Sequence, residues 1–112
     1  FLNEGVLVTN GTDVPVEDVD PLTCYYAAVT RKTKSGEAFY PAQCMTREEA
    51  IYSYTMANAL AAFEEKEKGS LEPGKLADIV MLSNNLVTCN EDDIKSTKVK
   101  LTVVGGKVKY RQ

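Results

Sequence analysis

The pattern of apolar and polar residues changes once along this chain, near Gly69, and that change limits the folds the chain can adopt. Before Gly69 the apolar residues recur at helical spacing, and two segments begin with helix-capping residues. After Gly69, short apolar runs alternate with turn residues, which is typical of strands. We therefore predict an α+β arrangement for the isolated chain, with the helices before Gly69 and most of the strands after it.

The first helix is predicted at Asp20-Pro21. Aspartate is a favourable N-cap, and proline fits the first helical position because its missing N–H would have no partner there. This helix should run to about Arg31 or Lys32. Residues 33–43 follow it and have the Ser-Gly and Pro content of a loop.

The second helix is predicted after Thr46, which forms a capping box with Glu49. Apolar residues continue at near-helical spacing as far as Phe63, and a charged stretch then leads to Gly69. Because glycine commonly follows the last residue of a helix, we expect this helix to end there. It is the longest helix expected.

Strands are expected in four places. Val6–Val8 and Ala77–Leu82 are apolar runs that suit buried strands. Lys98–Val104 and Lys107–Arg111 alternate between apolar and polar residues, and Gly105-Gly106 between them suits a two-residue turn. The chain should therefore end in a β-hairpin.

Composition excludes several classes of protein. The formal net charge of −3 gives no field that would attract nucleic acid or an acidic membrane. No apolar run approaches the roughly 18 to 20 residues that cross a bilayer, and no signal peptide is recognisable at the N-terminus. We expect a cytoplasmic protein that binds neither nucleic acid nor membranes.

The reactive side chains that the chain contains also limit the reactions it could catalyse by itself. The chain has no histidine, so it cannot assemble a Ser-His-Asp or Cys-His nucleophile from its own residues. Its three cysteines, Cys24, Cys44 and Cys89, are far apart and fit free thiols better than disulfides or a zinc knuckle.

Residues 6–16, VLVTNGTDVPV, place Asp13 directly after the first apolar run and its turn. Composition and spacing alone favour an Asx-turn, in which the carboxylate accepts a hydrogen bond from the backbone that follows. The alternative is a functional carboxylate at the end of a strand. These residues by themselves leave both interpretations open.

Four segments together carry a resemblance to a known family. VLVTNGTDVPV, DPLTCYYAAVTRKTKSG, MTREEAIYSYTMANALAAFEEKEKGSLEPGKLADIVML and KVKLTVVGGKVKY, in this order, resemble the C-terminal end of metal-dependent amidohydrolases. The branch includes N-substituted formamide deformylases. The resemblance covers the chain from about Gly5 to Tyr110 and is specific for the superfamily, but weak for the substrate.

The resemblance implies an α/β parent protein with two parts. Residues 1–68 would be the end of a (β/α)₈ barrel, with Val6–Thr9 as its last strand and the two helices closing it. Residues 69–112 would be the C-terminal strands of a small β-sandwich, shared with the N-terminal segment of the parent. The 112-residue chain would then be a C-terminal fragment.

The resemblance also implies a site. The last barrel strand of the family ends in an aspartate that binds the metal or contacts the water beside it, and Asp13 occupies that position. Thr12 stands where the family usually has serine. It could orient Asp13 or cap the turn. Arg31 could contact a substrate carboxylate or form a structural ion pair.

The expected activity is hydrolysis of a carbon–nitrogen bond in a small amide or N-acyl substrate, through a water activated by a divalent metal, with zinc as the expected ion. The fragment alone should bind no metal, be inactive and tend to self-associate through its uncovered apolar edges. The alternative is a small non-catalytic α+β module with a structural or binding role.

Overall fold

The computed structural model describes residues 1–112. Its regular elements, in chain order, are η1 (Leu2–Glu4), α1 (Pro21–Thr30), η2 (Pro41–Gln43), α2 (Arg47–Tyr54), α3 (Met56–Ala61), β1 (Ile79–Leu82), α4 (Glu91–Ser96), β2 (Val99–Val104) and β3 (Lys107–Arg111). The two η elements are short 3₁₀ helices. Helices precede most of the strands, so the α+β arrangement expected for the isolated chain is confirmed.

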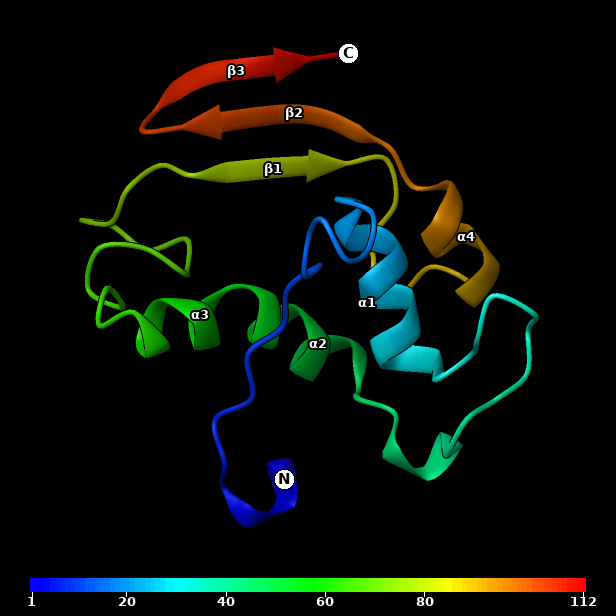
Figure 1. The fold of residues 1–112 in the computed structure, drawn as a ribbon. Coiled ribbons are helices and arrows are strands. Elements are labelled where there is room, and N and C mark those ends of the chain that lie inside the picture. Colours follow the sequence, from blue (N-terminus) through cyan, green and yellow to red (C-terminus); the bar gives the residue numbers. More distant parts are fainter.

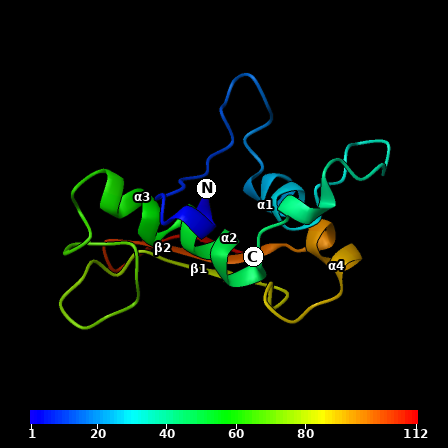
Figure 2. The ribbon, with the colours of Figure 1, turned by 90° about the horizontal axis from the view of Figure 1, so that it is seen from below.

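The strands and the helices form two groups. Figure 1 shows the strands stacked in the order β1-β2-β3, with β1 nearest to the helices. Helices α2 and α3 follow one another beneath β1, and α1 and α4 lie side by side at the other end. Seen from below, α2 lies in front of the strands, and α1 and α4 lie toward one end of them (Figure 2). No helix has the length and apolar character needed to cross a membrane.

The local signals for the first helix are confirmed. Asp20 is the N-cap of α1, and its Oδ1 accepts a hydrogen bond of 3.0 Å from the backbone N–H of Leu22. The helix ends at Thr30 because Arg31 adopts a left-handed conformation, with φ 54°. The predicted loop at residues 33–43 contains η2 but is otherwise irregular.

The capping box of the second helix is also confirmed, but the single long helix is wrong. Thr46 Oγ1 accepts from the Glu49 N–H at 3.1 Å, and Glu49 Oε2 accepts from the Thr46 N–H at 2.8 Å. Thr55 interrupts the helix, since its hydroxyl donates to the carbonyl of Ile51 at 2.8 Å and its φ and ψ are −122° and −89°. The second piece, α3, ends at Ala61, before left-handed Phe63, rather than at Gly69.

The three-stranded sheet bears out the hairpin. Strands β2 and β3 pair antiparallel around Gly105 and Gly106, whose φ values of 56° and 74° fit a turn that requires positive φ at both positions. Strand β1 pairs antiparallel with β2, but it begins at Ile79 and is mostly exposed, with Val80 56% accessible. The predicted strand is therefore confirmed over Ile79–Leu82, but its predicted burial is wrong for this chain.

The predicted strand at Val6–Thr9 is absent. Residues 6–13 have no regular structure, because a strand needs a hydrogen-bonding neighbour and no other strand of the chain pairs with this segment. Val6 and Leu7 remain about half exposed, at 49% and 47%. Their place in a barrel, like the sandwich around the sheet, stays a prediction.

The small core lies where α1, α2 and α4 meet. It comprises Tyr25 and Tyr26 of α1, Ala50 of α2 and the fully buried Ile94 of α4. Burial raises the pKa of Tyr25, whose hydroxyl donates to the Leu86 carbonyl at 3.2 Å. Helix α4 was not predicted. It begins after Asn90 with three acidic residues, a composition that favours a helix N-terminus.

An ion pair between Lys32, just after α1, and Glu91, the first residue of α4, links these two helices. The hydrogen bond from Lys32 holds the pKa of Glu91 below its ordinary value, and the same bond raises the pKa of Lys32. The stabilisation from Glu91 is therefore present above its unfolded-state pKa and is lost as pH falls through its lower folded-state pKa. Both side chains are more than a third exposed, so the effect is small.

We expect the Glu91→Gln variant to melt at a lower temperature than the parent at pH 7. This difference in Tm should shrink as pH falls and disappear at a low pH that lies below the lowered folded-state pKa of Glu91, where its carboxyl is protonated even in the folded parent. The control is Asp92→Asn, which removes a neighbouring charge that forms no ion pair. Thermal unfolding at both pH values provides the measurement, and a Tm difference that persists at low pH would contradict this account.

Candidate functional site

The segment that carries Asp13 is attached to the helices at Asn10. The Asn10 N–H donates to the Ser53 carbonyl at 3.0 Å, and Asn10 Nδ2 donates to Ser53 Oγ at 2.8 Å. The Asn10 carbonyl accepts from Asn58 Nδ2 at 3.0 Å. We call these three residues the Asn10 clamp. They fix the chain against α2 and α3 three residues before Asp13.

Asp13 is exposed at the first position of a turn. It adopts a left-handed conformation, with φ 54°, and its carbonyl accepts from the Val16 N–H at 2.8 Å. Aspartate tolerates this conformation better than most residues. Its carboxylate makes no hydrogen bond or ion pair, so the Asx-turn interpretation has no support here, and the side chain is open to an external group.

The structure does not bring Thr12 and Arg31 together with Asp13 through any hydrogen bond. Thr12 is half-buried beside Asp13 in the chain, and its hydroxyl has no hydrogen bond. Arg31 turns toward its own loop: Nε donates to the Phe39 carbonyl at 3.1 Å, and the guanidinium lies 5.5 Å from the centre of the Phe39 ring. Arg31 therefore makes structural contacts, but they are with a backbone carbonyl and an aromatic ring and not the ion pair with a carboxylate.

The chain contains no group of three His, Cys, Asp or Glu side chains that could hold a metal ion. Asp13 is a single carboxylate, and its oxygens are of the kind that divalent cations accept as ligands. It fits as one ligand of a metal but does not form a metal site by itself.

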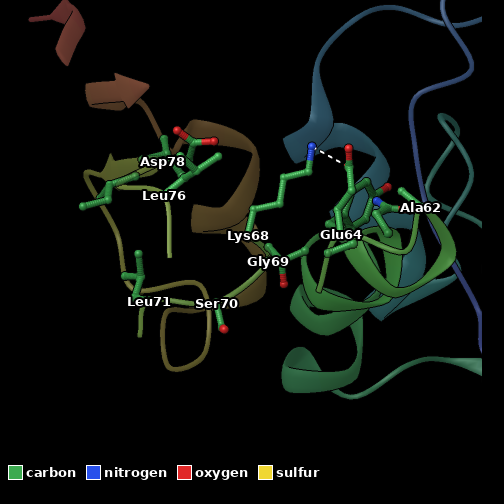
Figure 3. Close-up of a pocket in the computed structure, with 14 residues that line it drawn as sticks. Ala62, Glu64, Lys68, Gly69, Ser70, Leu71, Leu76 and Asp78 are labelled. Atoms are coloured by element: carbon green, nitrogen blue, oxygen red, sulfur yellow. Dashed lines mark ion pairs between the residues drawn. The ribbon is translucent and has the colours of Figure 1, made fainter. Parts of the chain in front are cut away.

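Two cavities of similar size lie away from Asp13. One of about 570 Å³ lies between α3 and the start of β1. Glu64 and Lys68, which both line it, form an ion pair of 2.6 Å that Figure 3 shows as a dashed line. The pairing raises the pKa of Lys68. Asp78 also lines this cavity, and its Oδ1 accepts from the Gly105 N–H at 2.7 Å. Asp78 thus joins the β2–β3 turn to the residue just before β1.

A second cavity of about 560 Å³ lies between the helices and the sheet. It is mostly apolar and includes Tyr54, whose pKa is raised to about 12 by burial and by the neighbouring Cys24. Neither cavity combines polar groups in an arrangement that indicates chemistry. The exposed Asp13 and its clamp are therefore the candidate site.

Sequence reasoning missed the Asn10 clamp. Asn10 precedes Gly11, a pair that indicates only a turn, and Ser53 and Asn58 stand among apolar helix residues with no motif to mark them. Their meeting depends on a contact between segments more than 40 residues apart, which no local pattern reveals.

Several known proteins are similar to this chain. It is 31% identical to the putative amidohydrolase YtcJ of Bacillus subtilis and 32% identical to the N-substituted formamide deformylase of Arthrobacter pascens, over all of its length in both cases. It is 40% identical over 98% of its length to the protein LONG AFTER FAR-RED 3 of Arabidopsis thaliana. The chain spans only 22%, 21% and 19% of these relatives, respectively.

The fold gives the same result. The crystal structure of an amidohydrolase from Thermotoga maritima matches 99% of the chain, with a TM-score of 0.71 and 25% sequence identity, and the chain covers 24% of that protein. The sequence pattern of the amidohydrolase family matches residues 1–110. The resemblance noted from the sequence is thus confirmed, and the chain belongs to the amidohydrolase family.

Proposed function

We infer that this chain is the C-terminal part of a metal-dependent amidohydrolase that cleaves the carbon–nitrogen bond of a small amide or N-acyl substrate. The observation that carries the proposal is the exposed Asp13 carboxylate, free of internal partners, in a chain that matches the family over residues 1–110. The formamide deformylase among its relatives supports an amide as the substrate class.

Asp13 is the proposed catalytic residue of this chain. Its carboxylate accepts a proton from the attacking water, the water oxygen bonds to the carbonyl carbon, and the carbon–nitrogen bond then breaks. Asp13 returns the proton to the leaving nitrogen, so that the products are a carboxylic acid and an amine. The Asp13 side chain is exposed, so that a substrate could reach it.

A divalent metal, with zinc as the expected ion, would supply the acidity that water lacks at neutral pH, by lowering the pKa of water to roughly 7. Asp13 would be its one ligand from this chain, and the other ligands would come from residues outside it. Thr12 remains a candidate for orienting Asp13 through its hydroxyl, and Arg31 a weaker candidate for contacting substrate.

The proposal predicts that the complete protein releases amine and acid from N-formyl or N-acyl amines. An N-substituted formamide is the first probe, and formate release is the readout. Dialysis against a chelator should abolish turnover, and added zinc should restore it. No turnover across a panel of such amides, or turnover that survives complete metal removal, would contradict the proposal.

A further inference from the structure

The Asn10 clamp is the polar contact that attaches the segment before Asp13 to α2 and α3. Asn10 is half-buried and receives or donates three hydrogen bonds of 2.8 to 3.0 Å, to partners on two helices. Between Gly5 and Asp13 no other backbone hydrogen bond joins the segment to a helix of the α2–α3 pair. The segment's position therefore depends on this residue.

The Ser53 hydroxyl accepts its hydrogen bond from Asn10, because its own proton is used elsewhere. Ser53 is 1% exposed, and its hydroxyl donates to the Ala50 carbonyl at 2.7 Å. A hydroxyl carries one proton, so its oxygen is left to accept, and Asn10 Nδ2 at 2.8 Å supplies the donor. Without Asn10 this buried oxygen would lose a partner, which carries a free-energy penalty.

The interruption at Thr55 accounts for the meeting of Ser53 and Asn58 at one residue. In a regular helix, positions five apart point about 140° away from one another, since 3.6 residues make a turn. Ser53 ends up on one side of the break and Asn58 on the other, and both contact Asn10. The break in the helix thus brings Ser53 and Asn58 to the same residue, Asn10.

Only Gly11 and Thr12 separate the clamp from Asp13. Three peptide units reach at most about 11 Å, so the clamp limits where the Asp13 turn can lie. The turn is closed beyond Asp13 by the Val16 N–H, which donates to the Asp13 carbonyl at 2.8 Å.

We propose that Asn10, Ser53 and Asn58 are positioning residues, which hold the Asp13 turn in the place and orientation that catalysis requires. This inference rests on the proposed role of Asp13. Ser53 and Asn58 would then act on the site by holding Asn10, and not by contacting the substrate.

The positional part is tested without substrate, by hydrogen–deuterium exchange of the complete protein. Ser53→Ala and Asn58→Ala should each raise the exchange rate of the peptide that includes the Val16 amide, by about fivefold to tenfold, the effect expected from loss of one hydrogen bond. Asn58 is exposed, so its replacement leaves folding intact.

Thr97→Val is the matched control for Ser53→Ala. Thr97 is 3% exposed, its hydroxyl donates to the Asp93 carbonyl at 2.9 Å, and it accepts from Asn84 at 3.1 Å, at the junction of α4 and β2. The Thr97→Val substitution removes a buried hydroxyl that, like that of Ser53, both donates and accepts a hydrogen bond, and it leaves Asn10 untouched. Exchange at Val16 should be unchanged in this variant.

The catalytic part is tested by turnover of an N-substituted formamide. Ser53→Ala and Asn58→Ala should each lower kcat about tenfold, with KM within about twofold, because misplacing a catalytic group slows the reaction more than it weakens binding. The decrease should be absent when Asp13 is already Asn, since the clamp acts through Asp13.

The outcomes separate the two proposals. Unchanged Val16 exchange in both clamp variants, or an equal loss of kcat with and without Asp13, would overturn the clamp while leaving the role of Asp13 intact. Near-normal turnover of Asp13→Asn would overturn the proposed function, whatever the exchange data show.

Discussion

Asp13→Asn in the complete protein should lower kcat by between about a hundredfold and ten-thousandfold, the range that a general acid or base contributes. Asparagine keeps the size and the turn preference of aspartate, so the left-handed conformation at φ 54° should survive. It cannot accept a proton at neutral pH. KM should change little, because the proton transfer belongs to the transition state.

Asp18→Asn is the matched control. Asp18 is another exposed carboxylate in the same loop, and it has no hydrogen bond or ion pair. Its replacement removes the same charge five residues from Asp13 and should leave kcat within about twofold, since exposed charges act weakly over this distance. Equal losses in the two variants would indicate a general electrostatic effect rather than a role for Asp13.

Gly69→Ala should lower the free energy of unfolding by about 2 to 4 kcal/mol. Two costs add. Gly69 has φ 96°, which side chains other than glycine adopt only with strain. A Cβ there would also lie 2.7 Å from Ala59 Cβ and 3.1 Å from Met56 Cα, both on α3, and a close-packed helix cannot give way to it without cost.

Gly74→Ala separates these two costs. Gly74 has the same φ of 96°, but a Cβ there would meet nothing within 4 Å. Its replacement should therefore show only the conformational cost, about 1 kcal/mol. Urea unfolding of both variants measures the difference, and equal losses would mean that the close approach of Gly69 to α3 does not stabilise the fold.

Signals carried by a few neighbouring residues gave correct predictions. The Asp20 cap, the Thr46–Glu49 capping box and the Gly105-Gly106 turn were all found in the structure. Each depends on hydrogen bonds or φ values within about five residues, so the local sequence contains the whole cause. The family resemblance followed from the order of several such segments.

Features that depend on other segments were missed. The Val6–Thr9 strand needs a neighbour that the chain does not provide, and the exposure of Val80 reflects the lack of a covering layer. The break at Thr55 results from its side-chain bond to Ile51, which competes with a strong apolar helical pattern. Helix α4 has a single buried residue, Ile94, too few for a periodic signal.

The candidate site was predictable only in part. Asp13 could be selected only from the family resemblance, since its place after an apolar run favoured an Asx-turn, and its exposure in the structure is compatible with the functional role. The clamp could not be selected, since it joins Asn10 to residues 43 and 48 positions away. The identity of the substrate depends on residues outside the chain.

The most direct test of the central claim is a crystal structure of the complete protein with its metal bound and located by anomalous scattering. Our account predicts that the Asp13 carboxylate contacts the metal or the water beside it, with the Asn10 clamp intact. A metal bound elsewhere, with the Asp13 carboxylate directed into solvent, would contradict the account.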